Sequence, residues 1–363
     1  MSLVTAGWVI SMLNATACVI GLAAGAFADM LGARRVTLVA LAVTAAASLA
    51  GALADDSIAL LITRFVEGMG SIVVFVSGPI VILRVIRNTD MRLALGFWGS
   101  YMPAGIAIMV IATPAMLDTI GWRGIWVVNA GLLAGYLIIY WAGTRGAPDA
   151  PAAPVPVRAR VRGLSRDIRA VLGSKGSWML ALVFSTYTAG FACTTSFLPV
   201  YLIEERNVSP GRAATITAIV VGANILGNLL GGWLLHRGAP RWKLISLTLA
   251  IMSASGILAY QPFVGTAGIF VLVLVFSGCG GIVPASVFSG VPLHVAHPRQ
   301  VGAGNGLVMQ WSNIGQFAGP PLFATLAASM GWSVAPWLVV GLSFVGIVIA
   351  LRIGRFEARL GNR

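Results

Sequence analysis

The chain has 363 residues, of which 58% are hydrophobic and only 10% are charged, and its mean hydropathy is +0.90. A soluble domain cannot bury so much apolar surface, so the composition predicts an all-α membrane protein with lipid as the solvent for most of the chain. The formal net charge of +13 would suit a protein that binds nucleic acid. However, the basic residues gather in alternate loops, which excludes that class of partner.

The residue types that carry enzyme chemistry form no recognisable site in the sequence. Cys18, Cys193 and Cys279 each fall inside an apolar run, so we interpret them as small core residues. His294 and His297 lie in a short polar loop, where we expect both to be solvated. With no Ser-His-Asp set, metal cluster or phosphate loop in the sequence, we expect a non-enzyme without cofactor or metal.

Eleven segments are long and apolar enough to cross a bilayer as helices, which takes about 20 residues each. Five of them precede a charged, proline-rich stretch and six follow it. The predicted segments are residues 5–28, 36–54, 58–86, 93–117, 124–142, 178–203, 212–235, 243–260, 267–293, 302–328 and 334–351.

The connection between the first two segments carries one acid, two arginines and two glycines. Gly25 lets a helix end approach its neighbour, and Gly32 can adopt the positive φ of a tight reversal. With Asp29, Arg34 and Arg35 they form the spacing G-x-x-x-D-x-x-G-x-R-R. This spacing resembles the loop signature of the major facilitator superfamily of secondary transporters. The resemblance implies a gating loop in which Asp29 stabilises the state closed to the cytoplasm.

The distribution of Lys and Arg predicts the orientation in the membrane. If the eleven segments alternate in direction, 20 of the 24 basic residues fall on the side of Arg34 and Arg35. Three fall on the other side, and Arg64 lies within a helix. Cytoplasmic loops carry such an excess. We therefore expect a multi-pass protein of the cytoplasmic (inner) membrane, with the amino terminus outside and the carboxyl terminus in the cytoplasm.

The third segment contains two ionisable residues one helical turn apart, Arg64 and Glu67. An arginine within a bilayer costs roughly 2.5–3.5 kcal/mol, so Arg64 should face a cavity or a partner such as Glu67. The run Arg64-Phe65-Val66-Glu67-Gly68-Met69-Gly70 resembles the R-x-x-x-G-x-G signature of the same superfamily, which usually has Gln where Glu67 stands. The resemblance implies that Arg64 tunes proton transfer or holds an anionic substrate. The alternative is a structural ion pair near the outer interface.

Residues 144–176 separate a predicted amino-terminal bundle, residues 1–143, from a carboxyl-terminal bundle, residues 177–363. The first part of this linker, residues 148–156, is proline-rich and should be extended. The second part places Leu164, Ile168, Val171 and Leu172 on one helical face. This pattern suits a helix on the inner leaflet, and a solvated linker is an equal alternative.

An internal repeat supports two parallel halves. Gly68 and Gly70 recur at Gly278 and Gly280, and Gly121-Trp122 recurs at Gly331-Trp332, each 210 residues later. Such halves are what the two-bundle fold of the superfamily implies. The segment 178–203 has no counterpart in the first half, so we expect a twelve-helix transporter that lacks its first helix, either through a misassigned start codon or through truncation.

Polar residues on the later helices are candidate substrate contacts, although each could instead bond a neighbouring helix. They are Tyr187, Thr194, Asn224, Gln310 and Asn313. The resemblance implies a monomeric secondary transporter that moves a small organic solute by alternating access, with proton coupling left open. The alternative is a truncated remnant that does not transport.

Overall fold

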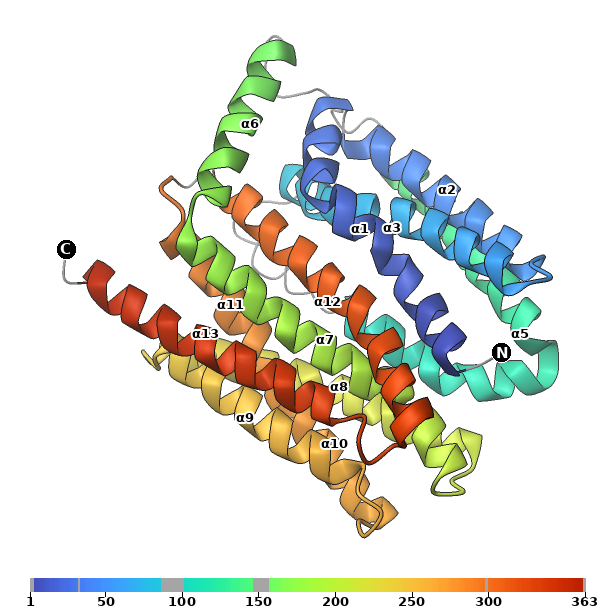
Figure 1. Ribbon diagram of the computed structural model, residues 1–363. Coiled ribbons are helices and arrows are strands. Elements are labelled where there is room, and N and C mark those ends of the chain that lie inside the picture. The colour runs from blue at the N-terminus through green and yellow to red at the C-terminus, as the bar shows by residue number, and fades with distance from the viewer. Residues whose placement is uncertain (1–2, 32, 86–100, 146–156, 298–299, 362–363) are drawn as a thin grey trace. The chain divides into compact units, whose positions relative to one another are not determined.

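The computed structural model of the protein describes residues 3–31, 33–85, 101–145, 157–297 and 300–361, and in these ranges it consists of helices and short turns (Figure 1). The helices are α1 (Leu3–Leu31), α2 (Ala33–Ala52), α3 (Ser57–Val85), α5 (Tyr101–Gly143), α6 (Val157–Leu172), α7 (Lys175–Glu204), α8 (Pro210–His236), α9 (Arg241–Ala259), α10 (Thr266–Gly280), α11 (Ile282–His294), α12 (Val301–Met330) and α13 (Trp337–Gly361).

The described helices have the length and surface of membrane-spanning segments. Eight helical stretches in these ranges are long and apolar enough to cross a bilayer. Their exposed side chains are often large and apolar, which suits contact with lipid rather than water. Examples are Ile58, Ile108, Ile138, Leu226, Leu229 and Phe344. The prediction of an all-α membrane protein is confirmed, and each of the eleven predicted segments carries a described helix, although residues 93–100 lie outside the described ranges.

Two glycines related by the repeat mark the same kind of helix break. The fourth and fifth predicted segments are the two arms of α5, which is bent at Gly121 with φ 66° and ψ 176°. Gly331, 210 residues later, follows α12 with φ 90° and ψ 165°. Because L-residues with a side chain rarely adopt such angles, glycine is required at both turns. The common backbone conformation agrees with the predicted repeat.

The chain forms two compact units, and the first comprises residues 12–102 and 115–168. In it, α2 packs along α3, and the hydroxyl of Thr16 on α1 donates to the carbonyl oxygen of Phe65 on α3 at 2.9 Å. Gly68 and Gly70 make these close crossings feasible, because a Cβ at Gly68 would collide with the carbonyl of Leu13 and one at Gly70 with Thr44. Both glycines of the predicted R-x-x-x-G-x-G stretch therefore serve helix packing.

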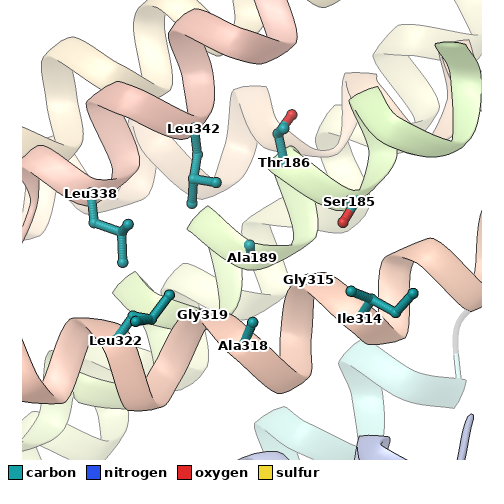
Figure 2. A pocket seen from close by; sticks show the side chains of 10 residues that line it. All are labelled: Ser185, Thr186, Ala189, Ile314, Gly315, Ala318, Gly319, Leu322, Leu338 and Leu342. Atoms are coloured by element: carbon teal, nitrogen blue, oxygen red, sulfur yellow. The ribbon is translucent and has the colours of Figure 1, made fainter. Parts of the chain in front are cut away.

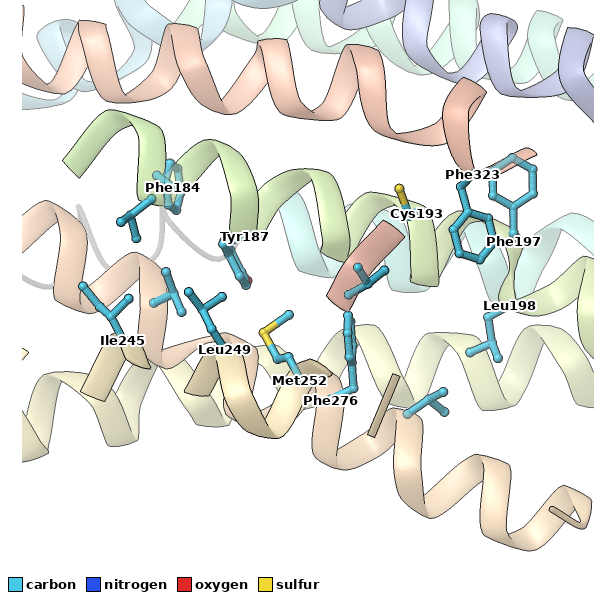
Figure 3. Close-up of a cluster of buried hydrophobic side chains, with 14 of the residues drawn as sticks. Phe184, Tyr187, Cys193, Phe197, Leu198, Ile245, Leu249, Met252, Phe276 and Phe323 are labelled. Carbon is cyan, nitrogen blue, oxygen red and sulfur yellow. The ribbon is translucent and has the colours of Figure 1, made fainter. Parts of the chain in front are cut away.

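The second unit, residues 1–11, 103–114 and 169–363, contains one contiguous buried core. Helix α7 lies alongside α12 and α13, and α10 packs against both α8 and α9 (Figure 1). Figure 3 shows how side chains from α7, α9, α10 and α12 fill the space between them. The labelled members of this core are Phe184, Tyr187, Cys193, Phe197, Leu198, Ile245, Leu249, Met252, Phe276 and Phe323.

Helix α6 confirms a helix in the second half of the predicted linker. Its side chains Arg166, Arg169 and Leu172 are exposed, whereas Val171 is buried in the core of the second unit. The indole Nε1 of Trp178 donates to the carbonyl oxygen of Leu172 at 2.8 Å, which fixes the end of α6 to the first turn of α7. Residues 148–156 lie outside the described ranges, and a position of α6 on the inner leaflet stays a prediction.

Candidate functional site

The two ionisable side chains predicted to pair in α3 form an ion pair in the structure. The guanidinium of Arg64 contacts the carboxylate of Glu67 through Nη2 and Oε2, as the one-turn spacing predicts. Glu67 is 2% exposed and Arg64 is 21% exposed, so the acid is the deeper partner. The pair lies about two helical turns from Ser57, where α3 begins. Removing either charge would leave the other one buried without its counterion.

Trp126 on the second arm of α5 covers the arginine. The Arg64 guanidinium carbon lies 3.8 Å from the centroid of the Trp126 ring, a cation–π distance. Gly51 on α2 gives the indole its space, because a Cβ there would overlap the ring. Ser48, one turn earlier, accepts from the amide of Asn129 at 2.9 Å and so ties α2 to the same arm of α5. Three helices thus position the cation of Arg64.

Two atoms of this pair retain unused hydrogen-bonding capacity. Oε1 of Glu67 and Nε of Arg64 are buried and have no hydrogen-bond partner among the described residues. Such an oxygen can accept a hydrogen bond and such an N–H can donate one, so both atoms are open to a further ligand.

A second polar network joins α7, α8 and α10. The amide of Asn224 donates both to the hydroxyl of Tyr187 at 3.1 Å and to the carbonyl oxygen of Ser277 at 3.0 Å. Asn228 donates to the side-chain oxygen of Asn224 at 3.2 Å. Gly280 lies against this network, since a Cβ there would come within 3.5 Å of Tyr187 and Asn224. The structure thus brings together two of the five candidate substrate contacts, Tyr187 and Asn224.

The other three candidates occupy different surroundings. The side chain of Thr194 is buried, and its carbonyl oxygen accepts from the hydroxyl of Tyr260 at 3.0 Å. Asn313 donates to the carbonyl oxygen of Met309 in its own helix at 2.8 Å. Gln310 lies on α12 and is half-buried. For Thr194 and Asn313, these contacts are those of helix packing and give no direct sign of a ligand.

A groove of about 160 Å³ lies between α7, α12 and α13 (Figure 2). Leucine side chains from α12 and α13 line it together with Ser185 and Thr186 of α7. At this groove the backbone of Gly315 on α12 lies close to α7, since a Cβ at Gly315 would collide with the carbonyl of Ser185. None of the five candidate substrate contacts lines this apolar groove, so it is a poor site for a polar solute.

The predicted gating loop is described only in part. Helix α1 continues to Leu31, so Asp29 stands in the last turn of a helix. The surroundings of Gly25 and of the Asp29 side chain lie outside what the structure describes. Gly32 lies outside the described residues altogether. Arg34 donates through Nε to the hydroxyl of Thr144 at 2.9 Å, which links the start of α2 to the end of α5. Arg35 is exposed.

A second charged cluster, which the sequence interpretation missed, involves α9, α11 and α13. Arg241 forms an ion pair with Glu357 and donates to the carbonyl oxygen of Ser286 at 2.7 Å. His294, expected to be solvated, is buried with a side chain 0% exposed, and its Nε2 lies 3.7 Å from Glu357 Oε1. That expectation was wrong because α11 extends to His294, while His297 beyond it is exposed as predicted.

Known proteins resemble the chain both in sequence and in fold. The family model described as Major Facilitator Superfamily matches residues 1–320. A nitrite extrusion protein of Bacillus subtilis is 26% identical over 230 residues, which cover 62% of this chain and 54% of that protein. A probable sulfoacetate transporter, SauU, of Cupriavidus necator is 23% identical over 345 residues, covering 91% and 80% respectively.

A solved structure of a bacterial homolog of the human lysosomal transporter Spinster has the same fold, with a TM-score of 0.77, 17% identity and coverage of 98% of this chain and 88% of that one. The chain spans 54% to 58% of the length of the curated nitrite and nitrate relatives that it matches. The helical architecture and a family match over most of the sequence lead to one conclusion: the chain belongs to the Major Facilitator Superfamily.

Proposed function

We propose that the chain is a secondary transporter that moves a small anionic solute together with a proton by alternating access. The observation that carries the proposal is the buried Arg64–Glu67 pair, whose carboxylate and guanidinium each retain one unused buried atom. Ionisable residues within spanning helices are costly, and they typically mark substrate or proton pathways. The relatives named for nitrite and sulfoacetate support an anion as the substrate class.

Each residue of the pair has a distinct role in this proposal. Protonation of Glu67 removes the negative charge that neutralises Arg64, so the guanidinium gains a free positive charge for an anion. When the anion leaves, Glu67 releases its proton and pairs with Arg64 again. Anion and proton therefore bind together. Trp126 holds the guanidinium in position in both states through its ring face.

The remaining features of the proposal follow from the charge pattern and the repeat. Residues 1–143 and 177–363 form the two bundles that move, with residues 144–176 as the linker. The excess of Lys and Arg supports a carboxyl terminus in the cytoplasm and a location in the cell membrane. Asp29 stabilises the state closed to the cytoplasm, and Tyr187 and Asn224 contribute neutral contacts to the solute. We expect the monomer to be the transporting form.

Uptake into proteoliposomes tests the proposal. The purified protein should accumulate a small anion from a panel of nitrate, nitrite and sulfoacetate when the outside is acidic, and it should not accumulate a neutral sugar. The Glu67→Gln variant should still exchange the anion across the membrane, but it should lose accumulation driven by the pH gradient.

Asp55→Asn is the matched control, because Asp55 also pairs with an arginine, Arg123, but is 94% exposed. This control should transport like the parent protein. Accumulation of no anion in the panel, or normal gradient-driven accumulation by Glu67→Gln, would contradict the proposal.

A further inference from the structure

Helix α6 carries most of its arginines and its larger apolar residues on two adjoining faces. The arginines of the first face recur at intervals of four, four and three residues, so they share one side of the helix. They are Arg158, Arg162, Arg166 and Arg169. The apolar face beside them has the same helical period. Its residues are Val157, Val161, Leu164, Ile168 and Leu172. Arg160 and Asp167, seven residues apart, fall together at the other edge of the apolar face.

The described side chains at the end of α6 agree with this division. Arg166 and Arg169 are exposed, and neither forms an ion pair with another residue that the structure describes. Leu172 on the apolar face is 42% exposed. Lys175, at the start of α7, is exposed as well. This end of α6 therefore offers unpaired positive charge beside an accessible apolar side chain.

The last turn of α6 must lie close to the bilayer surface, because a spanning helix begins directly after it. Helix α6 ends at Leu172, and α7, which is long and apolar enough to cross a membrane, begins at Lys175. Ser174 between them caps α7, since its hydroxyl accepts from the backbone N–H of Ser177 at 3.3 Å. Trp178 in the first turn of α7 is of the residue type that collects at membrane interfaces.

Three contacts fix the end of α6 to the start of α7 and to the core behind it. Nε1 of Trp178 donates to the carbonyl oxygen of Leu172 at 2.8 Å. Val171 is 2% exposed and belongs to the buried core of the second unit. The backbone N–H of Gly173 donates to the carbonyl oxygen of Arg169 at 3.0 Å and so closes the last turn of α6. A ligand that holds α6 at the surface therefore also holds the first turn of α7.

We propose that α6 binds anionic phospholipids of the cytoplasmic leaflet. The arginine face contacts the lipid phosphates, for which the planar guanidinium is a suitable donor, and the apolar face contacts the boundary of the acyl chains. The excess of Lys and Arg predicts that this end of α7 faces the cytoplasm, and the cytoplasmic leaflet attracts basic helices next to spanning segments. Nucleic acid would match the arginines but not the apolar face beside them. The inference goes beyond the proposed transport cycle, because the ligand is a lipid rather than the solute.

Hydrogen exchange of the full chain in lipid nanodiscs tests the inference. The backbone amides of α6 should exchange at least about tenfold more slowly in discs that contain phosphatidylglycerol than in discs of phosphatidylcholine alone, since each basic residue near an anionic surface adds to binding. Salt at about 1 M should reduce the difference by screening the charges. A variant without the arginine face should lose the difference. This variant is Arg158→Gln/Arg162→Gln/Arg166→Gln/Arg169→Gln.

The matched control is Arg352→Gln/Arg355→Gln, which removes two exposed arginines from the last turns of α13 and should keep the lipid dependence of α6. Equal exchange of the parent protein in the two kinds of disc would overturn the inference, whether or not the variants fold. So would an equal lipid dependence of the parent and the variant without the arginine face.

Two soluble ligands separate a lipid from other sources of phosphate. Glycerol 3-phosphate or a short RNA duplex, added to the parent protein in discs of phosphatidylcholine, should leave the exchange of α6 unchanged. Slowing by either of them to the degree expected of phosphatidylglycerol would overturn the assignment to a membrane lipid. Because the readout is exchange in α6 rather than uptake, the result is independent of whether the proposed transport activity is correct.

Discussion

At the scale of single residues, Arg64 and Glu67 form a buried ion pair in a mostly apolar helix. Both charges are largely removed from water, so their free energies depend on each other far more than those of an exposed pair. Arg123 and Asp55 provide the contrast within the same compact unit, since their side chains are 51% and 94% exposed at an N···O distance of 3.2 Å. Exposed pairs of this kind contribute little to stability.

We predict that Glu67→Gln destabilises the protein more than the Arg64→Gln/Glu67→Gln double variant does. The single change leaves a buried cation without its counterion, which typically costs about 3–5 kcal/mol, whereas removal of both charges is often close to neutral. Chemical denaturation in detergent would measure the difference. The corresponding changes at Asp55 and Arg123 should leave the transition almost unaffected, and equal losses in the single and double variants at 64 and 67 would show that the charges are not coupled.

The sequence could predict this pair but not its full surroundings. A spacing of three residues on a helix places two side chains together, so Arg64 and Glu67 follow from local geometry. Trp126 comes from a helix that begins far along the chain, and local periodicity contains no signal for such a contact. The polar residues after His294 predicted that its side chain would face solvent. The imidazole is buried instead, in a space that exists because Gly176, more than 100 residues earlier, has no side chain.

At the scale of elements, hydropathy located the helices well because lipid requires apolar spans of a definite length. It located their ends less well, since a helix can continue into water once it has left the apolar layer. The predicted segment 334–351 is an example. Helix α13 begins at Trp337 and continues to Gly361, and its last turns carry the exposed Arg352 and Arg355 together with the buried Ile353.

The repeat-related turns at Gly121 and Gly331 lead to a prediction about helix connections. Alanine at either position should destabilise the protein by about 1–3 kcal/mol, because a Cβ is strained at these backbone angles. The control is Gly341→Ala in α13, where a Cβ meets open space. That change should be neutral or stabilising, since alanine is the better helix former. Thermal melting of the three variants would measure the effects, and a Gly121→Ala or Gly331→Ala protein as stable as the control would contradict the required glycine.

At the scale of the whole molecule, three properties support the proposed transport function. The surface is apolar enough for a bilayer, the family match covers residues 1–320, and the charges of Arg64 and Glu67 are paired within a spanning helix. A paired charge cannot hold an anion until its partner is neutralised, and a proton is the simplest ligand that neutralises a carboxylate. Coupling of anion to proton is therefore the central claim, and it depends on the two residues in α3.

The most direct measurement is the internal pH of proteoliposomes when sulfoacetate or nitrate is added outside with no imposed pH gradient and with the membrane potential collapsed. Nitrate is the anion of a strong acid, and the sulfonate and carboxylate groups of sulfoacetate are both deprotonated at neutral pH. Neither solute therefore carries a proton of its own, so the pH change must come from the protein. Acidification of the interior should accompany anion entry for the parent protein and for Asp55→Asn, and it should be absent for Glu67→Gln. Anion entry without acidification, or equal acidification by Glu67→Gln, would contradict the account.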